Sequence, residues 1–308
     1  TAPTAGAARA TSEERIPQMS EKPITLTAYL RKGGVGKTTL VALLGQFLAA
    51  LGFRVAIIDL DRQGSQAAVF DLVDETGRGG EILHLVLKRR VDILAALAPV
   101  AVPRLAGHTP GELYVVPGGP QTAEAIEDIA ANPVRYKMPD TLDVVRGPIA
   151  QLAGHVDFAL VDMGPSDQVT ALAGLAATDR LLIPTTMDYL SVTSIAPVMD
   201  EVAVARQIHP ALAVLGIVPM MTRYYFGGLR KSQNVQAGEE FLLATYGELV
   251  LREGKAMLDF PYHEEVHKAM WAGLSLLSEE VSKTVRADVL RLLNGLAARL
   301  EVERVAHA

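Results

Sequence analysis

Three glycines and two lysines lie close together in the run Arg31-Lys32-Gly33-Gly34-Val35-Gly36-Lys37-Thr38-Thr39-Leu40. It follows a short apolar run, Ile24–Leu30, that is typical of a strand, and it precedes a segment predicted to be helical. Glycines in such a turn let the backbone direct its N–H groups inward. Together with the positive N-terminus of the following helix, these groups bind phosphate oxygens. The run therefore predicts a phosphate-binding loop.

Two side chains complete this predicted site. Lys37 would place a positive charge near the β and γ phosphates, and Thr38 would offer its hydroxyl to Mg²⁺. The alternative is a glycine-rich turn with incidental lysines, but the flanking strand and helix favour the phosphate loop. The predicted nucleotide-binding residues of the loop are Gly33, Gly34, Val35, Gly36, Lys37, Thr38 and Thr39.

Further strands are expected along the chain, with helices in the intervals. The further expected strands are Arg54–Asp59, Leu113–Pro117, Phe158–Asp162, Arg180–Thr185 and Ala213–Met220. Several of these runs are continuously apolar, which is typical of strands covered on both faces in a parallel sheet. Val281–Val305 carries leucines at helical spacing and is expected to be a closing helix packed on the sheet. The pattern predicts an α/β fold, a doubly wound, mostly parallel sheet with helices on both faces.

Composition limits the function classes. Residues 1–22 lack a sustained apolar period and are expected to form a flexible tail, and residues 23–308 are expected to form a single domain. The chain has no cysteine, which excludes disulfides and thiolate metal sites and fits a cytoplasmic location. No apolar run is long enough to span a bilayer. The net charge of −6 argues against a uniformly basic nucleic-acid binder but leaves room for a local basic patch.

The phosphate loop departs from the general pattern G-x-x-x-x-G-K-[ST], because Arg31 stands at its first position and an extra lysine, Lys32, precedes the paired glycines. In this the loop resembles the deviant Walker A box of the ParA/MinD family of ATPases. The resemblance implies that Lys32 is the signature lysine, which reaches across a nucleotide-bridged dimer to the phosphates of the partner. The alternative is a solvated charge beside the loop.

The resemblance extends to acidic residues at strand ends. Asp59 and Asp61 stand where the family usually reads D-x-D-P-Q-G, which implies that Asp61 positions the attacking water and Asp59 supports Mg²⁺. Asp162 resembles a Walker B aspartate that holds Mg²⁺. The alternative for the first two is that they cap the following helix. Arg62 replaces the usual proline. After Asp162 the chain reads Met163-Gly164-Pro165-Ser166 where the family more often has T-P-P-S, so Gly164 also replaces a proline, and both turns are expected to be looser.

The resemblance covers the chain from about Ile24 to Leu300. Since relatives build the base pocket from the ends of later strands, it implies that Met221 and Pro261 bind the nucleotide. The catalytic residues that it implies are Lys32, Lys37 and Asp61, and the Mg²⁺ residues are Thr38, Asp59 and Asp162.

A competing motif, H-E-x-x-H, spans His263 to His267. On a helix it would put two imidazoles on one face for zinc, with Glu264 as general base and Glu279 or Glu280 as a third ligand. A family-type loop occupies the same place and explains the helix start without metal. A zinc metalloprotease is therefore a less favoured alternative.

For the whole chain the resemblance implies an ATPase that uses ATP and Mg²⁺, dimerises with ATP and then binds nonspecific DNA. With a ParB-like activating partner it would segregate chromosome or plasmid DNA, and it would be cytoplasmic and associated with the nucleoid in the ATP state. The alternatives are a positioning ATPase for a non-DNA cargo or a membrane site, and a P-loop ligase or kinase. The end of the chain, 299–308, has two glutamates and no aromatic anchor, which argues against a membrane.

Basic residues late in the chain are the candidates for a stripe that neutralises DNA phosphates. Each of them, taken singly, is also consistent with a solvated surface charge. The predicted DNA-binding residues are Arg223, Arg230, Lys231 and Lys268, with Arg252, Lys255 and the run Lys88-Arg89-Arg90 as further candidates.

Overall fold

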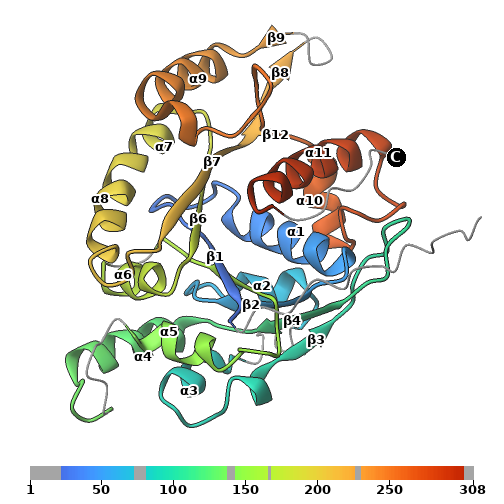
Figure 1. The fold of residues 1–308 in the computed structure, drawn as a ribbon. Helices are drawn as coiled ribbons and strands as arrows, with labels where there is room; N and C mark the ends of the chain where they lie inside the picture. The colour runs from blue at the N-terminus through green and yellow to red at the C-terminus, as the bar shows by residue number, and fades with distance from the viewer. Residues whose placement is uncertain (1–21, 73–80, 137–142, 166–167, 226–229, 302–308) are drawn as a thin grey trace, which may run out of the picture.

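A central sheet lies between two layers of helices in the computed structural model (Figure 1). The structure describes residues 22–72, 81–136, 143–165, 168–225 and 230–301. The expected tail, apart from Lys22, and the end of the expected closing helix lie outside the described residues.

All six strands expected from the sequence are present: three have the expected ends, and the ends of the other three differ by one or two residues. They are β1 (Ile24–Ala28), β2 (Arg54–Asp59), β4 (Glu112–Val116), β5 (Phe158–Asp162), β6 (Arg180–Thr185) and β7 (Ala213–Thr222). Two short edge strands, β3 (Ala98–Val100) and β12 (Phe260–Pro261), complete the order β12-β7-β6-β1-β5-β2-β4-β3. Among the described strands of this sheet, only β3 runs antiparallel to its neighbour, so the expected fold class is confirmed.

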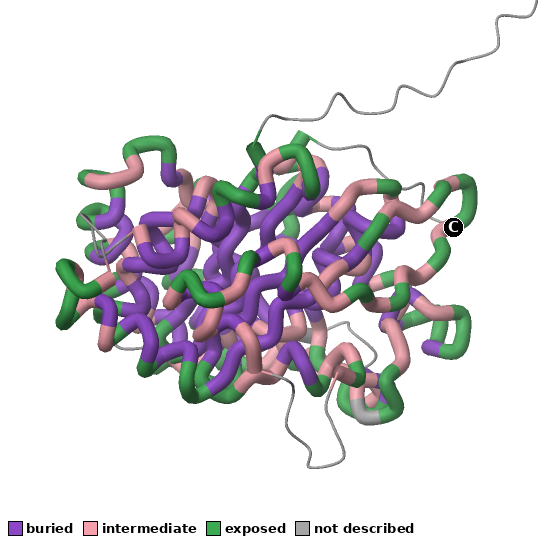
Figure 2. Tube along the Cα trace, turned by 90° about the horizontal axis from the view of Figure 1, so that it is seen from below, coloured by how far each residue is buried: buried purple, intermediate pink, exposed green. Residues whose placement is uncertain are grey.

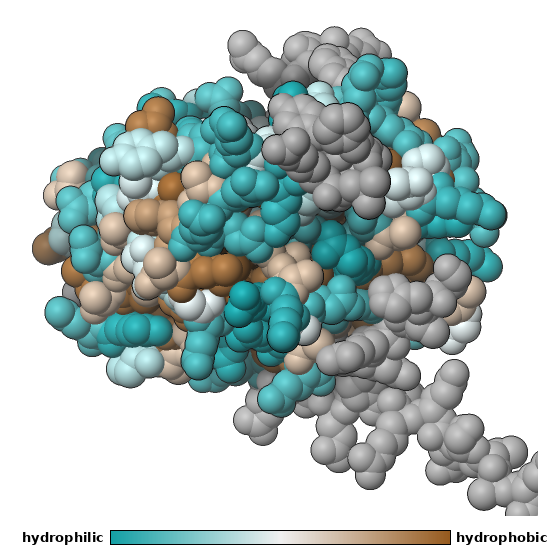
Figure 3. Space-filling view, turned by 90° about the horizontal axis from the view of Figure 1, so that it is seen from above, coloured by the Kyte–Doolittle hydropathy of each residue, from teal (hydrophilic) through white to brown (hydrophobic). Residues whose placement is uncertain are grey.

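Successive residues of a central strand enter different cores, which explains why these strands are apolar throughout. In β2, Val55 and Ile57 pack in one core cluster, whereas Ala56 and Ile58 pack in the other. Figure 2 shows the buried residues concentrated in the middle of the molecule. Seen from above, hydrophilic residues cover most of the visible surface, with apolar ones interspersed (Figure 3).

Helices cover both faces of the sheet. One core cluster holds residues of α1 (Lys37–Ala50), α10 (Glu264–Trp271) and α11 (Lys283–Arg299). The other holds residues of α3 (Leu83–Leu87), α4 (Pro120–Ala131), α5 (Asp143–Ala150), α6 (Gln168–Ala176), α7 (Tyr189–Thr193), α8 (Ile195–Ala205) and α9 (Gln233–Tyr246). The expected closing helix is α11, which packs against α1 and β12.

The hairpins β8–β9 (Tyr224–Tyr225 and Arg230–Lys231) and β10–β11 (Arg252–Glu253 and Ala256–Met257) form two small separate sheets. Short helical segments, α2 (Ser65–Val69), η1 (Leu94–Ala96) and η2 (Gly247–Leu249), fill the remaining connections.

The sheet register places the acidic strand ends side by side. Asp59 of β2 pairs in register with Asp162 of β5, and Ala28 at the end of β1 pairs with Asp162 on the other side. Because these strands are parallel, their carboxyl ends meet at one edge, which is where open α/β sheets bind ligands. The phosphate loop begins at this edge.

Candidate functional site

The phosphate loop joins β1 to α1 in the predicted place. Gly34 and Gly36 have φ angles of 71° and 89°, in the left-handed region that favours glycine. Gly36 is the N-cap of α1, and no described side chain caps this helix. The first N–H groups of a helix have no partner within it, so the uncapped end offers its donors and its positive dipole to an anion.

Lys37 is the first residue of α1, and its side chain is buried. Its ammonium donates a hydrogen bond of 2.8 Å to the carbonyl oxygen of Lys32. Burial lowers the pKa of this ammonium, and attraction to Asp162 and Asp61 partly opposes that effect. A buried cation held by one carbonyl is placed to gain strongly from a phosphate.

The other residues of the loop serve in part to anchor it. Val35 is buried in the core cluster that includes α6 and α8. The Thr39 hydroxyl lies 3.8 Å from the sulfur of Met270 in α10. These contacts hold the loop between the two helical layers.

The carboxylates of Asp59 and Asp162 are fully buried beside each other. Asp59 accepts hydrogen bonds from the backbone N–H groups of Asp61 (3.0 Å) and Gln66 (2.9 Å). Burial, and then repulsion from Asp162, raise the pKa of Asp59 well above its usual value. Burial also raises the pKa of Asp162 to about 6, against the opposing effects of the Thr38 and Gln66 side chains. Such a pair of crowded carboxylates gains from a divalent cation.

Gln66 contacts both of these carboxylates and is absent from the sequence-based prediction. Its side-chain amide nitrogen lies 2.8 Å from Asp162 Oδ2 and 3.2 Å from the carbonyl oxygen of Thr38. The signal that could have found it is its place seven residues after Asp59, on the short helix α2 that follows the acidic turn.

Asp61 is nearly buried, and its Oδ1 accepts a 2.9 Å hydrogen bond from the backbone N–H of Gln63. Gly164, in the turn after β5, leaves space for this carboxylate. A Cβ atom at position 164 would lie 2.4 Å from Asp61 Oδ1. The glycine that was expected only to loosen the turn therefore has a packing role beside Asp61.

Gly164→Ala is expected to displace Asp61 and to lower the rate constant of ATP hydrolysis by about 10- to 100-fold, since an error of about 1 Å in a catalytic group costs that much. ATP affinity should change little, because the phosphate loop is untouched. Turnover and binding of a fluorescent ATP analogue measure the two effects. Gly147→Ala is the matched control, because a Cβ at position 147 meets nothing within 4 Å. An unchanged rate in Gly164→Ala would contradict the packing role.

The side chain of Lys32 extends from the loop toward α7. Its ammonium donates hydrogen bonds to Asp188 Oδ1 (2.7 Å) and to Ser191 Oγ (2.8 Å), at the start of α7. Its side chain is 32% exposed, and the next two residues of α7, Tyr189 and Leu190, are 76% and 66% exposed. Lys32 therefore belongs to a surface that a second molecule can reach.

Asp188 is built to hold a cation. Burial raises its pKa, but hydrogen bonds from Lys32, Thr186 and Ser191 outweigh that effect and hold the pKa well below its usual range. Asp188 is also the N-cap of α7 and accepts from the Ser191 N–H. The neighbouring Arg31 forms a separate ion pair with Glu201 of α8.

The segments expected to form the base pocket lie next to each other. Met220 pairs with Phe260, and Thr222 pairs with Pro261, so Met221 and Pro261 lie at adjacent strand ends. Met221 has a φ of 53°, which is uncommon for a non-glycine residue. A Cβ at Gly36 would lie 3.1 Å from the Cε of Met220, so this strand end also contacts the phosphate loop.

Most of the predicted DNA-binding side chains with described surroundings have partners. Lys231 forms an ion pair with Glu239, and Lys268 lies 2.9 Å from Glu264. The guanidinium of Arg223 lies over the ring of Tyr262, at 4.5 Å from its centroid. Arg230 belongs to the hairpin strand β9.

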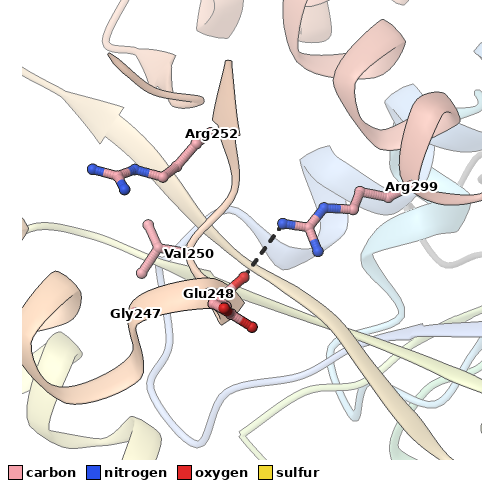
Figure 4. A pocket seen from close by; sticks show the side chains of 5 residues that line it. All are labelled: Gly247, Glu248, Val250, Arg252 and Arg299. Atoms are coloured by element: carbon pink, nitrogen blue, oxygen red, sulfur yellow. Dashed lines mark hydrogen bonds between the residues drawn. The ribbon is translucent and has the colours of Figure 1, made fainter. Parts of the chain in front are cut away.

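Arg252 and Lys255, in the β10–β11 hairpin, are exposed, and no ion pair joins either to a described residue. Arg252 lines an open pocket of about 480 Å³ together with Arg299 (Figure 4). Arg299 donates a 3.3 Å hydrogen bond to the carbonyl oxygen of Glu248 in the same pocket. This hairpin therefore offers cationic side chains to solvent.

The zinc motif is not assembled as a metal site. His263 is the N-cap of α10 with extended φ, and its Nε2 lies 2.9 Å from Asp288 Oδ2. The ring of His267 lies near Tyr262 instead. Within the described part of the chain, no group of three His, Asp or Glu side chains is placed to hold a metal ion, so the motif lacks a third ligand. No described helix has the length and apolar character needed to cross a bilayer.

The donor set at the sheet edge fits a magnesium nucleotide. The uncapped helix end and buried Lys37 suit phosphates, and the Thr38 hydroxyl and the carboxylates suit a hard cation that prefers oxygen ligands. Asp162 Oδ1 is buried and has no hydrogen-bond partner among the described residues, so it can coordinate such an ion or accept a hydrogen bond from one of its water ligands.

Comparisons with known proteins show which proteins the chain is similar to. A family model described as an AAA domain matches residues 24–214. The chromosome partitioning protein ParA of Caulobacter vibrioides is 29% identical over 206 residues, 66% of this chain and 72% of the relative. The maintenance of carboxysome distribution protein A (McdA) of Synechococcus elongatus is 27% identical over 254 residues, 82% of this chain and 91% of the relative. The ATP complex of a Cyanothece McdA variant shares the fold, with a TM-score of 0.73, 20% identity and coverage of 93% of this chain and 100% of that chain.

Proposed function

The chain belongs to the ParA/MinD family of P-loop ATPases, and from that membership we propose that it is an ATP-gated switch that dimerises, binds nonspecific DNA and positions a DNA cargo. It is an ATPase, and its cofactors are ATP and Mg²⁺. The dimer, the DNA and the cargo are the parts that this proposal adds.

One observation carries the proposal of a dimer, and it is the position of Lys32. If Lys32 acted on its own nucleotide, its ammonium would be directed at the same phosphates as the Lys37 ammonium. Lys32 instead contacts Asp188 and Ser191 at a partly exposed surface beside α7. In the proposed switch, a second subunit with bound ATP attracts Lys32 away from Asp188 and onto its phosphates, because a triphosphate carries more charge than one carboxylate.

Hydrolysis is in-line attack of water on the γ-phosphate. Asp61 accepts a hydrogen bond from the attacking water and orients it, and Lys37 stabilises the charge on the phosphate oxygens. Thr38 and Asp162 would hold Mg²⁺, with Asp59 in support. The ion, when bound, neutralises charge on the phosphates. Lys32 of the second subunit would add the last positive charge, so that turnover depends on the dimer.

Support for DNA as the track comes from a relative and from charge. The similar protein of Caulobacter vibrioides is a chromosome partitioning protein. In this chain, the β10–β11 hairpin exposes Arg252 and Lys255, and Arg299 lies near Arg252. We include these residues in the proposed DNA surface beside the predicted Arg223, Arg230, Lys231 and Lys268. Phosphate contacts of this kind bind DNA without reading its sequence.

Reset of the switch is assigned to a ParB-like activating protein, which would stimulate hydrolysis and release the dimer from DNA. The ATP state would therefore be associated with the nucleoid in the cytoplasm. The carboxysome distribution protein among the relatives makes a non-DNA cargo the second candidate. In that case the same ATPase would position a different assembly.

Charge reversal tests the DNA surface. The double variant Arg252→Glu with Lys255→Glu is expected to weaken binding to random duplex DNA in the ATP state and to lower the salt slope by about two, since each phosphate contact contributes about 0.9 to that slope. The matched control is Arg104→Glu with Arg135→Glu, two exposed basic residues outside the candidate DNA-binding set. Equal losses in the two double variants would indicate a net-charge effect and would remove the hairpin from the proposed surface. Unmutated protein that binds no DNA with ATP would favour the non-DNA cargo.

A further inference from the structure

Gln66 connects the three segments that form the nucleotide edge. Its backbone N–H donates to Asp59 Oδ2 at the end of β2 (2.9 Å). Its side-chain Nε2 donates to Asp162 Oδ2 at the end of β5 (2.8 Å) and to the carbonyl oxygen of Thr38 in the first turn of α1 (3.2 Å). The residue is fully buried, so water does not compete for these bonds.

The chemistry of the partners fixes the orientation of the Gln66 amide. Both atoms that its terminal nitrogen contacts are acceptors, a carboxylate oxygen and a backbone carbonyl oxygen. An amide oxygen in this place would face two acceptors and would form neither bond. The nitrogen therefore lies toward Asp162 and Thr38, and the amide oxygen lies on the other side.

Two acceptor oxygens of this pair have no hydrogen-bond partner among the described residues. They are Asp162 Oδ1 and Gln66 Oε1, and both are buried. Leaving a buried acceptor without a donor costs free energy, and a native protein keeps such atoms where a water or an ion completes them. A hydrated cation supplies both an ionic ligand and O–H donors.

We propose that Gln66 is a positioning residue of the Mg²⁺ site: its amide holds Asp162 through Oδ2 and so leaves Oδ1 as the oxygen that meets the ion or its water ligands. The same amide fixes the Thr38 carbonyl, so that the Thr38 hydroxyl and the Asp162 carboxylate keep one relative position. This inference rests on the proposed assignment of Thr38 and Asp162 to Mg²⁺.

Gln66→Met tests the proposal, because methionine has a similar volume and keeps the backbone bond to Asp59 but neither donates nor accepts through its end. The probe is Mn²⁺, titrated by electron paramagnetic resonance into the protein saturated with ADP. The affinity for Mn²⁺ is expected to fall by about 10-fold or more, as for other residues that orient metal ligands. The affinity for ADP measured without a divalent ion should stay within about 2-fold of that of the unmutated protein, because the phosphate loop keeps its own donors.

Gln46→Met is the matched control. It makes the same substitution on α1 and also removes one side-chain hydrogen bond, the 2.7 Å bond from Ser275, outside the nucleotide edge. Mn²⁺ affinity should not change in this control. A second variant, Gln66→Asn, keeps the amide but is one methylene too short to reach Asp162. Mn²⁺ affinity should fall in this variant as well, so it provides the same test if Gln66→Met folds poorly.

Asp162→Asn shows whether a negative result concerns the role of Gln66 or the assignment of Asp162 to Mg²⁺. If Asp162→Asn weakens Mn²⁺ binding and the Gln66 variants do not, Gln66 is a packing residue and the inference is wrong. If Asp162→Asn itself leaves Mn²⁺ binding unchanged, the proposed assignment of Asp162 to the ion is wrong, and the inference fails with it. Losses in both, with ADP binding retained, support the positioning role.

Discussion

Asp61→Ala is expected to lower ATP hydrolysis by at least about 100-fold, the effect of losing a group that orients and accepts from the attacking nucleophile. Its carboxylate lies at the end of the turn after β2, next to the buried Asp59 and against Gly164. ATP binding should survive, because the phosphates are held by the loop and Lys37. Steady-state phosphate release and binding of a fluorescent ATP analogue measure the two properties.

The matched variant for this test is Asp61→Asn, which keeps the size of the side chain and the capacity to accept the Gln63 N–H, but carries no charge. It should also lose most of the turnover. Both variants should accumulate ATP-dependent dimers, because hydrolysis no longer resets the switch. Near-normal turnover in Asp61→Asn would contradict the assignment of Asp61 as the residue that activates the water.

Lys32→Ala is expected to reduce turnover by about 1,000-fold or more, since a positive charge supplied by a second subunit to a transferring phosphoryl group is worth that much in other phosphate-loop enzymes. ATP-dependent dimers should also be lost, because Lys32 would contact the partner's phosphates. Size-exclusion chromatography with light scattering detects the dimer, and phosphate release gives the rate. Binding of ATP to the monomer should persist.

Asp188→Asn tests whether Lys32 acts through its contact with Asp188 or through the phosphates of a second subunit. The asparagine can still cap α7 but no longer holds the ammonium as an ion pair, so Lys32 is released toward a second subunit. Dimers should then form at least as readily as in the unmutated protein. Equal losses of dimer in Lys32→Ala and Asp188→Asn would show that the contact is only structural and that Lys32 has no role across an interface.

Strong local patterns account for the parts of the fold that the sequence predicts. The six main strands are mostly apolar runs, and the phosphate loop has glycines at the positions where the backbone is left-handed. The carboxylates meet because parallel strands end at one edge. The edge strands β3 and β12 escape prediction, since runs of three and two residues that contain proline carry no periodic signal.

The site contacts that the sequence does not predict join residues that are far apart in the chain. Lys32 and Asp188 are 156 residues apart, and only the packing of α7 beside the loop brings them together. Gln66 contacts Asp162, which is 96 residues later, because α2 turns back over the strand ends. Partners such as Glu239 for Lys231 also depend on the folded chain, so a basic residue in the sequence does not reveal which cations face solvent.

The most direct test of the proposed switch is the binding of Asp61→Ala protein to random-sequence duplex DNA, compared with ATP and with ADP across a salt series. Blocking hydrolysis keeps the ATP state long enough to measure it. Tight binding that requires ATP and weakens steeply with salt is the predicted result, because dimerisation gathers cationic side chains over the phosphates. Absence of DNA binding in both nucleotide states, with ATP-dependent dimers present, would contradict DNA as the track of this ATPase.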